Sequence, residues 1–106
     1  MTDKIIALTN TGSEEEARSI ARALVERKLA ACVNIIPGVE SIYWWKGKIE
    51  TASEWTLLIK TVRTNFEPIR DAIRELHSYD LPECIAITLE SGSPEYLNWI
   101  SESLKA

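Results

Sequence analysis

Residues Ala30 to Thr61 read AACVNIIPGVESIYWWKGKIETASEWTLLIKT and are the most informative part of the sequence for the fold. Its first half, up to Trp45, is rich in β-branched and aromatic residues and is interrupted only at Pro37-Gly38, where a bend or bulge is expected. Lys46-Gly47-Lys48 is typical of a hairpin turn, and the segment from Ile49 onward alternates as a returning strand does. The pattern predicts one long, bent β-hairpin, much longer than an average strand pair.

Upstream of this hairpin, the sequence predicts a strand followed by a helix. Residues Ile5 to Asn10 form a short β-type run. Ser13 and Glu16 have the spacing of a capping box, in which each side chain bonds the backbone N–H of the other residue at the start of a helix. Apolar residues then recur on one face at helical spacing: Ala17, Ile20, Ala21, Leu24 and Val25.

Downstream of the hairpin, the sequence predicts a second helix, a strand and a last short helix. Asn65 is the expected cap of the second helix, with Thr64 as the alternative, and the helix should end near His77. Cys84 to Leu89 is an apolar run of strand length, and Ser93 is the expected cap of the last helix. The two helices have apolar stripes made of Phe66, Ile69, Ile73 and Leu76, and of Leu97, Ile100 and Leu104.

The order of these elements is β-α-β-β-α-β followed by a C-terminal helix. The 106 residues leave room for one domain, spanning residues 1–106. This order predicts an α+β, ferredoxin-like fold, in which two helices cover one face of a four-stranded antiparallel sheet. Apolar residues fall on both faces of the predicted strands. Because an uncovered apolar face promotes aggregation, we expect the chain to associate with copies of itself.

Composition and charge exclude several classes of protein. The net charge is −4 and the isoelectric point is about 5.0, with no dense basic cluster, so we expect no nucleic-acid partner. The uncharged stretches are well short of the roughly 20 residues that a spanning helix needs, and the N-terminal residues lack a secretory leader. We therefore expect no membrane association and a cytoplasmic location, where Cys32 and Cys84 should be two buried thiols rather than a disulfide.

Several motifs together resemble one known family. They are residues 31–50, ACVNIIPGVESIYWWKGKIE, with Leu58-Ile59-Lys60-Thr61, the segment from His77 to Glu83, and Tyr96-Leu97-Asn98-Trp99. Over essentially the whole chain the sequence is similar to the CutA divalent-ion (divalent-cation) tolerance proteins. The resemblance implies a ferredoxin-like subunit that assembles into a homotrimer, similar to the PII signalling proteins, with sheets joined edge to edge around a threefold axis. It also implies a connection to tolerance of copper and other divalent cations.

The candidate metal ligands are His77, Cys32 and Glu83. His77 is the only histidine, and imidazole suits Cu(II) or Zn(II), whereas the Cys32 thiol suits softer ions. The family's copper binding is attributed to a cysteine near the end of the first strand and to adjacent histidines after the second helix. Thr9 and the pair Leu76-His77 stand at those positions, so only His77 carries over. The alternative is that His77 caps the C-terminal end of its helix and donates to a carbonyl or to Glu83.

A second candidate site is a pocket between subunits. Lys60, Tyr79 and Glu83 are polar groups at the ends of predicted elements, near which the clefts of a PII-like trimer lie, and they suit a metal, an anion or a small polar metabolite. The hairpin aromatics Tyr43, Trp44, Trp45 and Trp55 are interpreted as core and interface area, with a ligand-stacking platform as the alternative.

The residues predict a non-catalytic protein that associates with itself, and the resemblance implies a homotrimer that binds metal ions, copper first among them, and that functions in divalent-cation tolerance. Catalysis has little support, because the sequence contains no nucleophile elbow, no evident carboxylate pair and no glycine-rich phosphate loop. Two alternatives stay open. One is a PII-like sensor whose cleft binds a metabolite, and the other is a stable trimeric scaffold for a protein partner.

Overall fold

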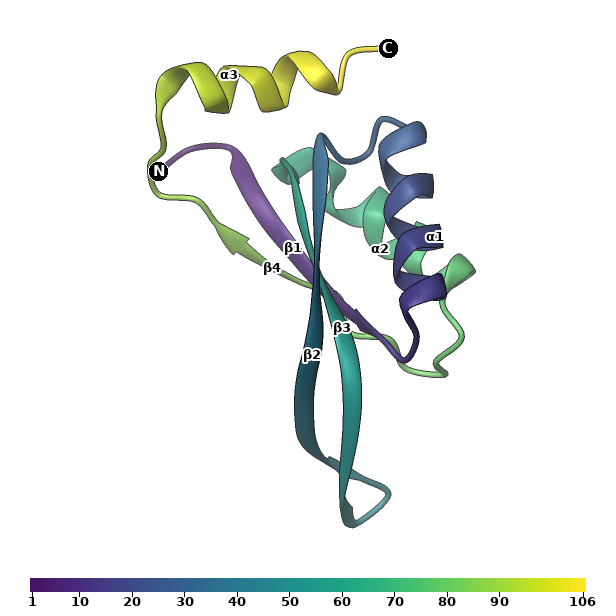
Figure 1. Cartoon of the computed structure of the whole chain (residues 1–106). Helices are drawn as coiled ribbons and strands as arrows, with labels where there is room; N and C mark the ends of the chain where they lie inside the picture. The colour runs from purple at the N-terminus through teal and green to yellow at the C-terminus, as the bar shows by residue number, and fades with distance from the viewer.

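The computed structural model describes all residues, 1–106, and forms a single antiparallel sheet with three α-helices (Figure 1). The strands follow the order β2-β3-β1-β4 across the sheet. This is the predicted α+β, ferredoxin-like arrangement, and the C-terminal helix is also confirmed. In chain order the elements are β1 (Lys4–Thr11), α1 (Glu14–Glu26), β2 (Cys32–Trp45), β3 (Lys48–Val62), the 3-10 turn η1 (Arg63–Asn65), α2 (Phe66–Leu76), β4 (Ile85–Thr88) and α3 (Pro94–Ser103).

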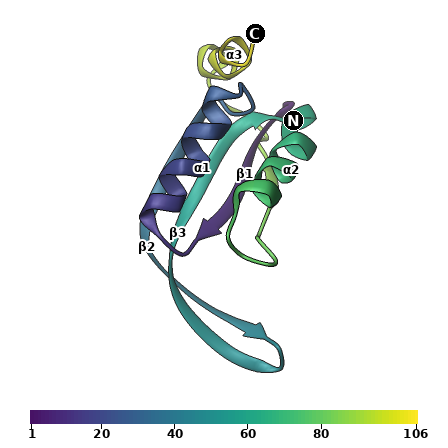
Figure 2. The ribbon, with the colours of Figure 1, turned by 90° about the vertical axis from the view of Figure 1, so that its right-hand side faces the viewer.

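The core lies between one face of the sheet and the two helices α1 and α2. Both helices cover the same face, as Figure 2 shows with α1 and α2 in front of the strands. Alternation along β1 and β3 turns every second residue toward the helices, which is why the core residues are spaced by two in the strands and by three or four in the helices. The largest contributors are Ile20 and Leu24 from α1, Leu57 and Ile59 from β3, and Ile69 and Ile73 from α2.

The helix caps differ in part from those expected. Ser13 caps α1, since its hydroxyl accepts from the Glu16 N–H at 3.1 Å. The Glu16 carboxylate does not return to Ser13 but accepts from the backbone N–H and hydroxyl of Ser78, 3.0 and 3.1 Å away. Asn65 precedes α2 but makes no side-chain cap bond, because its amide donates to the Leu29 carbonyl at 3.1 Å. Tertiary partners therefore replace two of the expected local bonds.

The β2–β3 hairpin is the longest feature of the chain and extends well beyond the helices (Figure 1). The strands pair from Cys32 opposite Lys60 to Trp45 opposite Lys48, with the expected bulge between Ile36 and Val39. The turn consists of Lys46 and Gly47, both at positive φ (50° and 81°), the conformation of the two-residue turn that suits the twist of a hairpin. The projection explains the elongated shape, 44 × 26 × 23 Å.

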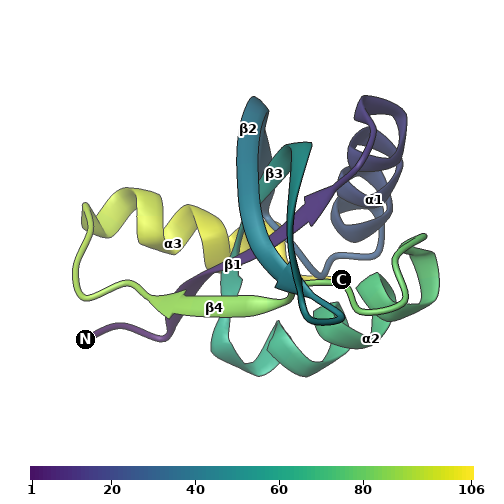
Figure 3. The same ribbon diagram turned by 90° about the horizontal axis from the view of Figure 1, so that it is seen from below.

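The sheet face opposite α1 and α2 is only partly covered. The helix α3 lies above the upper ends of the strands in Figure 1, and Figure 3 shows it on the other side of the sheet from α1. Below it, Ile85 and Ile87 of β4 are 54% and 56% exposed, and they stand opposite Leu8 and Ile6 of β1. The predicted second apolar face is therefore present.

The hairpin aromatics do not supply the core of the chain, contrary to that part of the expectation. Only Trp55 packs against the core, and it is half-buried. Tyr43 and Trp45 are exposed and Trp44 is 71% exposed, because the hairpin passes beyond the helices that cover the rest of the sheet. Cys32 and Cys84 are free thiols, as expected, but both are only partly buried. None of the helices has the length and apolar character needed to cross a membrane.

Candidate functional site

His77 ends α2 and connects three segments of the chain. Its Nε2 lies 2.6 Å from the carbonyl oxygen of Asn10, and its Nδ1 lies 3.0 Å from the backbone nitrogen of Tyr79. Because a backbone N–H can only donate, Nδ1 must accept from Tyr79, and Nε2 must carry the proton given to Asn10. The ring is therefore the neutral Nε2–H tautomer. Its side chain is completely buried, with Glu16 Oε1 3.7 Å from Nδ1.

This geometry favours the capping interpretation of His77. In that interpretation the ring donates to a carbonyl, and it does so here. The carbonyl is that of Asn10, near the end of β1, rather than one of α2. A metal needs a free nitrogen lone pair, and the one on Nδ1 is already shared with the Tyr79 N–H. Ligation by His77 would have to replace that bond.

The other proposed soft ligand lies elsewhere in the chain. Cys32 stands opposite Lys60 on β3, whereas the Asn10 carbonyl that holds His77 stands opposite Thr56, four residues or about 13 Å further along the strand. The Cys32 thiol instead faces the Asn34 side chain, with Sγ 3.9 Å from Oδ1. No three His, Cys, Asp or Glu side chains of one chain come together as a metal site. The predicted set of His77, Cys32 and Glu83 does not meet within one subunit.

Thr9, where the resemblance leads one to expect a cysteine, faces the core. Its side chain is fully buried, and its hydroxyl has no hydrogen-bond partner in the chain. A metal ion that binds hard oxygen ligands usually needs several of them. No group of metal-ligating side chains surrounds the Thr9 hydroxyl. Thr9 therefore offers no replacement for a copper-binding thiolate.

A polar cluster lies where the loop after α2 meets the base of the hairpin. The Tyr79 hydroxyl donates to Glu54 Oε2 at 2.8 Å, and the Asn10 amide donates to Glu83 Oε1 at 3.3 Å. Asn10 is itself held by the Thr56 hydroxyl, which donates to its Oδ1 at 2.6 Å. The carboxylates of Glu54 and Glu83, which are far apart in the sequence, are thus each held by a hydrogen bond from a neighbouring side chain.

Charge is crowded in this cluster. Partial burial raises the pKa of the Glu83 carboxyl, and the negative charge of Glu54 raises it further. Burial also raises the pKa of Tyr79 to about 12, and the hydrogen bond to Glu54 adds to the effect because it favours the protonated phenol. Desolvation is the larger cause of both shifts, and the negative charge of Glu54 is the smaller one. A bound cation would offset the part that Glu54 causes.

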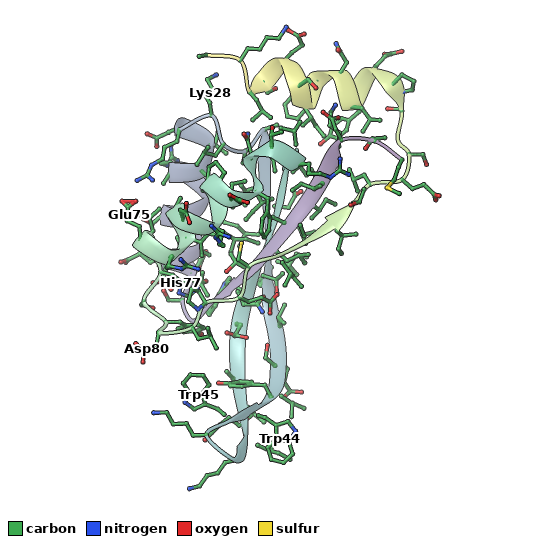
Figure 4. The ribbon with its side chains drawn as sticks, turned by 180° about the vertical axis from the view of Figure 1, so that it is seen from behind. Lys28, Trp44, Trp45, Glu75, His77 and Asp80 are labelled. Atoms are coloured by element: carbon green, nitrogen blue, oxygen red, sulfur yellow. The ribbon has the colours of Figure 1, made fainter.

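The cluster forms one wall of a pocket of about 540 Å³. The hairpin supplies a second wall, and the loop after α2 closes one side. In Figure 4, Trp45 from the hairpin and Asp80 from this loop lie on the same side of the molecule. The lining consists of Asn10, Ser41, Ile42, Tyr43, Trp44, Trp45, Glu54, Tyr79, Asp80, Leu81 and Glu83.

Of the residues predicted for a pocket, Tyr79 and Glu83 do lie together and Lys60 does not. Lys60 is six residues from Glu54 along β3, or about 20 Å, and its ammonium lies 3.4 Å from the Tyr96 hydroxyl on α3. Glu54 was missed by sequence reasoning, although it is only 7% exposed. The available signal was its place in the alternation of β3, on the same face as Thr56 and Leu58.

Replacing Tyr79 with phenylalanine tests the bond to Glu54. We expect the free energy of unfolding at pH 8 to fall by about 1 to 2 kcal/mol, because a hydrogen bond to a charged group is lost from a partly exposed site. The raised pKa means that the folded state alone keeps the phenol proton between pH 10 and about 12. Wild-type stability should therefore fall as pH rises through that window, and the fall should be smaller in Tyr79→Phe. Urea denaturation at pH 8 and pH 11 measures both effects.

The matched control is Tyr96→Phe, whose hydroxyl receives only the long bond from Lys60 on α3. This variant should keep the wild-type dependence on pH. An unchanged alkaline slope in Tyr79→Phe would show that another group causes it.

Comparison with known proteins identifies the family. The sequence profile described as CutA1 divalent ion tolerance protein matches residues 5–103. The chain belongs to the CutA1 divalent ion tolerance family. A relative from Thermus thermophilus, named "Divalent-cation tolerance protein CutA", is 45% identical over 98 residues, which are 92% of this chain and 95% of the relative.

Solved structures of the CutA1 family share the fold. CutA from Xylella fastidiosa superposes with a TM-score of 0.95 at 40% identity, covering 98% of this chain and 100% of that one. A structure from Archaeoglobus fulgidus, described as a periplasmic divalent cation tolerance protein CutA, gives a TM-score of 0.93 at 43% identity, with 96% and 99% covered. The α+β fold and the family resemblance stated from the sequence are both confirmed.

Proposed function

We infer that the chain is a non-catalytic, cation-binding protein of divalent-cation tolerance, that it acts as a homotrimer, and that it works in the cytoplasm. The observation that carries the cation-binding part is the pair Glu54 and Glu83 on one wall of the pocket. Burial and, to a lesser degree, the charge of Glu54 raise the pKa of Glu83, so a cation bound beside the two carboxylates offsets the repulsion between them. The family's connection to divalent cations supports this reading.

The donor set decides which ions fit. Glu54 and Glu83 offer carboxylate oxygens, whereas Asp80 lines the same pocket without joining them as a three-residue metal site. Two such hard oxygen groups suit an ion that keeps several waters. Copper was the first ion expected from the sequence, and it prefers nitrogen and sulfur ligands. Copper binding by His77 or Cys32 therefore stays a proposal that requires ligands from a second subunit, since the two residues lie apart within one chain.

The proposed trimer is supported by the exposed apolar surface of the sheet. Ile85 and Ile87 on β4 continue an apolar face with Ile6 and Leu8, and β2 and β4 are both edge strands. Isolated proteins rarely leave such a surface open, because it promotes pairing with other chains. Burial between subunits is the simplest way to cover it.

Calorimetric titration of the purified protein with Cu(II), Zn(II), Ni(II) and Mg(II) tests the cation site. Replacing Glu83 with glutamine should weaken binding by about tenfold, because one of two adjacent charges is removed with little change of shape. Binding should also strengthen as pH rises through the carboxylate range, because the raised pKa keeps Glu83 protonated to a higher pH than usual. The matched control Glu90→Gln, outside the pocket, should bind as the wild type does.

The absence of binding for all four ions would remove the cation-binding proposal. Equal binding by Glu83→Gln and wild type would move the site away from Glu83. In that case, loss of Cu(II) binding on changing Cys32 to serine would indicate a site between subunits.

A further inference from the structure

Part of the lining of the pocket is aromatic, and we call this part the aromatic wall. Tyr43 and Trp45 share one face of β2 and line the pocket together with Trp44, whose ring points to the other side of the hairpin in Figure 4. All three are exposed in the chain rather than used in its core. The carboxylates Glu54, Asp80 and Glu83 line the same space, and no lysine or arginine does. Aromatic faces and negative charge therefore surround one cavity.

An inorganic divalent ion uses only half of this arrangement. Such an ion is satisfied by oxygen ligands and water, and it has no need of indole rings or of about 540 Å³ of space. That volume lies in the range of sites for small organic molecules. An organic ammonium ion uses both walls, because its charge is attracted by carboxylates and by the faces of aromatic rings, and its carbon groups are covered by the rings.

Two further observations describe the charges next to the pocket. Glu54 is more than nine-tenths buried, yet only its Oε2 has a hydrogen bond, from Tyr79, and Oε1 receives none from the chain. The ring of Trp45 already attracts an ammonium group, since Lys46 Nζ lies 5.7 Å from its centroid. Lys46 is at the tip of the hairpin and reaches the ring from outside the lining of the pocket.

We propose that this pocket binds a small organic ammonium ion, held by Glu54 and Glu83 on one side and by Trp45 and its aromatic neighbours on the other. The inference deepens the proposed function, because it assigns a second class of cation to the same carboxylates. The two classes differ in their use of the aromatic wall, and that difference separates them by experiment.

The probes are tetramethylammonium and n-butylammonium chloride, titrated against sodium chloride of equal ionic strength and followed by calorimetry and tryptophan fluorescence. Replacing Trp45 with leucine should weaken ammonium binding by about tenfold, because a cation–π contact and its apolar cover are lost. The same variant should bind divalent ions as the wild type does. Glu83→Gln should weaken both classes of cation. Trp99→Leu, an equal change on α3 outside the pocket, should weaken neither.

Replacing Lys46 with alanine gives an effect of opposite sign, which damage to the fold cannot imitate. Removing the competing ammonium from the Trp45 ring should tighten ammonium binding by about threefold. Circular dichroism on each variant checks that the hairpin is intact.

The outcomes separate the two proposals. Ammonium binding that is absent, or that is equal in wild type and Trp45→Leu, would overturn this inference. If divalent ions still bind through Glu83 in that case, the proposed function stands alone. Ammonium binding without divalent-ion binding would instead retain the organic ligand and remove the inorganic one.

Discussion

Replacing His77 with alanine is expected to lower the free energy of unfolding by about 2 to 4 kcal/mol. The imidazole is completely buried, so its removal leaves a cavity. It also removes the partners of two backbone groups, the carbonyl of Asn10 and the N–H of Tyr79. An unpartnered buried backbone group costs about 1 to 3 kcal/mol, less where water can enter. Urea denaturation at pH 7 measures the loss.

The neighbouring substitution Glu75→Ala is the control. Glu75 is exposed on α2, and its carboxylate makes a single long ion pair, 3.5 Å from Arg27, so its loss should change stability by less than about 0.5 kcal/mol. His77→Gln should recover part of the loss, because an amide group can still donate to Asn10. A His77→Ala protein as stable as the wild type would show that the ring does not connect these segments. Weaker metal binding at unchanged stability would instead support His77 as a ligand.

Replacing both Ile85 and Ile87 with aspartate is expected to convert the proposed trimer into a monomer. The helices α1 and α2 bury one face of the four-stranded sheet, and Ile85 and Ile87 of β4 are exposed on the other face. Two carboxylates on that face would have to lose their water on assembly, which is strongly unfavourable. Light scattering should therefore give about one third of the wild-type mass. The chain itself should stay folded, because both residues are more than half exposed within it.

Val25→Asp is the matched control for this change. Val25 is a partly exposed apolar residue on α1, which lies on the other side of the sheet, so this variant should keep the wild-type mass. Trp55→Asp is unsuitable as a test of assembly, because Trp55 packs against the core of the chain. A wild type that is a monodisperse monomer would contradict the proposed assembly outright.

Two of the three residues predicted for a pocket between subunits, Tyr79 and Glu83, line a pocket within the chain, and Glu54 was not among the predicted residues. The prediction rests on polar groups at the ends of elements, and Tyr79 and Glu83 meet because they are only a few residues apart in the loop after α2. Lys60 was grouped with Tyr79 and Glu83 because it is also a polar group at the end of an element. However, β3 is 15 residues long, and Lys60 lies near its C-terminal end, away from Glu54. The alternation of β3 gave the face on which Glu54 lies but not its partner, because the Tyr79 hydroxyl that bonds it is 25 positions away in the sequence.

The hairpin shows where local pattern ends and tertiary structure begins. Alternation along 30–61, the break at Pro37-Gly38 and the glycine at the tip determined its strands, bulge and turn, since these depend on backbone geometry within a few residues. The helix α1 and its cap at Ser13 also follow from residues that are close together in the sequence. The tautomer of His77, the burial of Glu54 and the meeting of aromatic and acidic walls were decided only by the tertiary structure. Each of these features depends on contacts between segments that are distant in the sequence. The strand register and the packing of the loop after α2 determine which segments make those contacts.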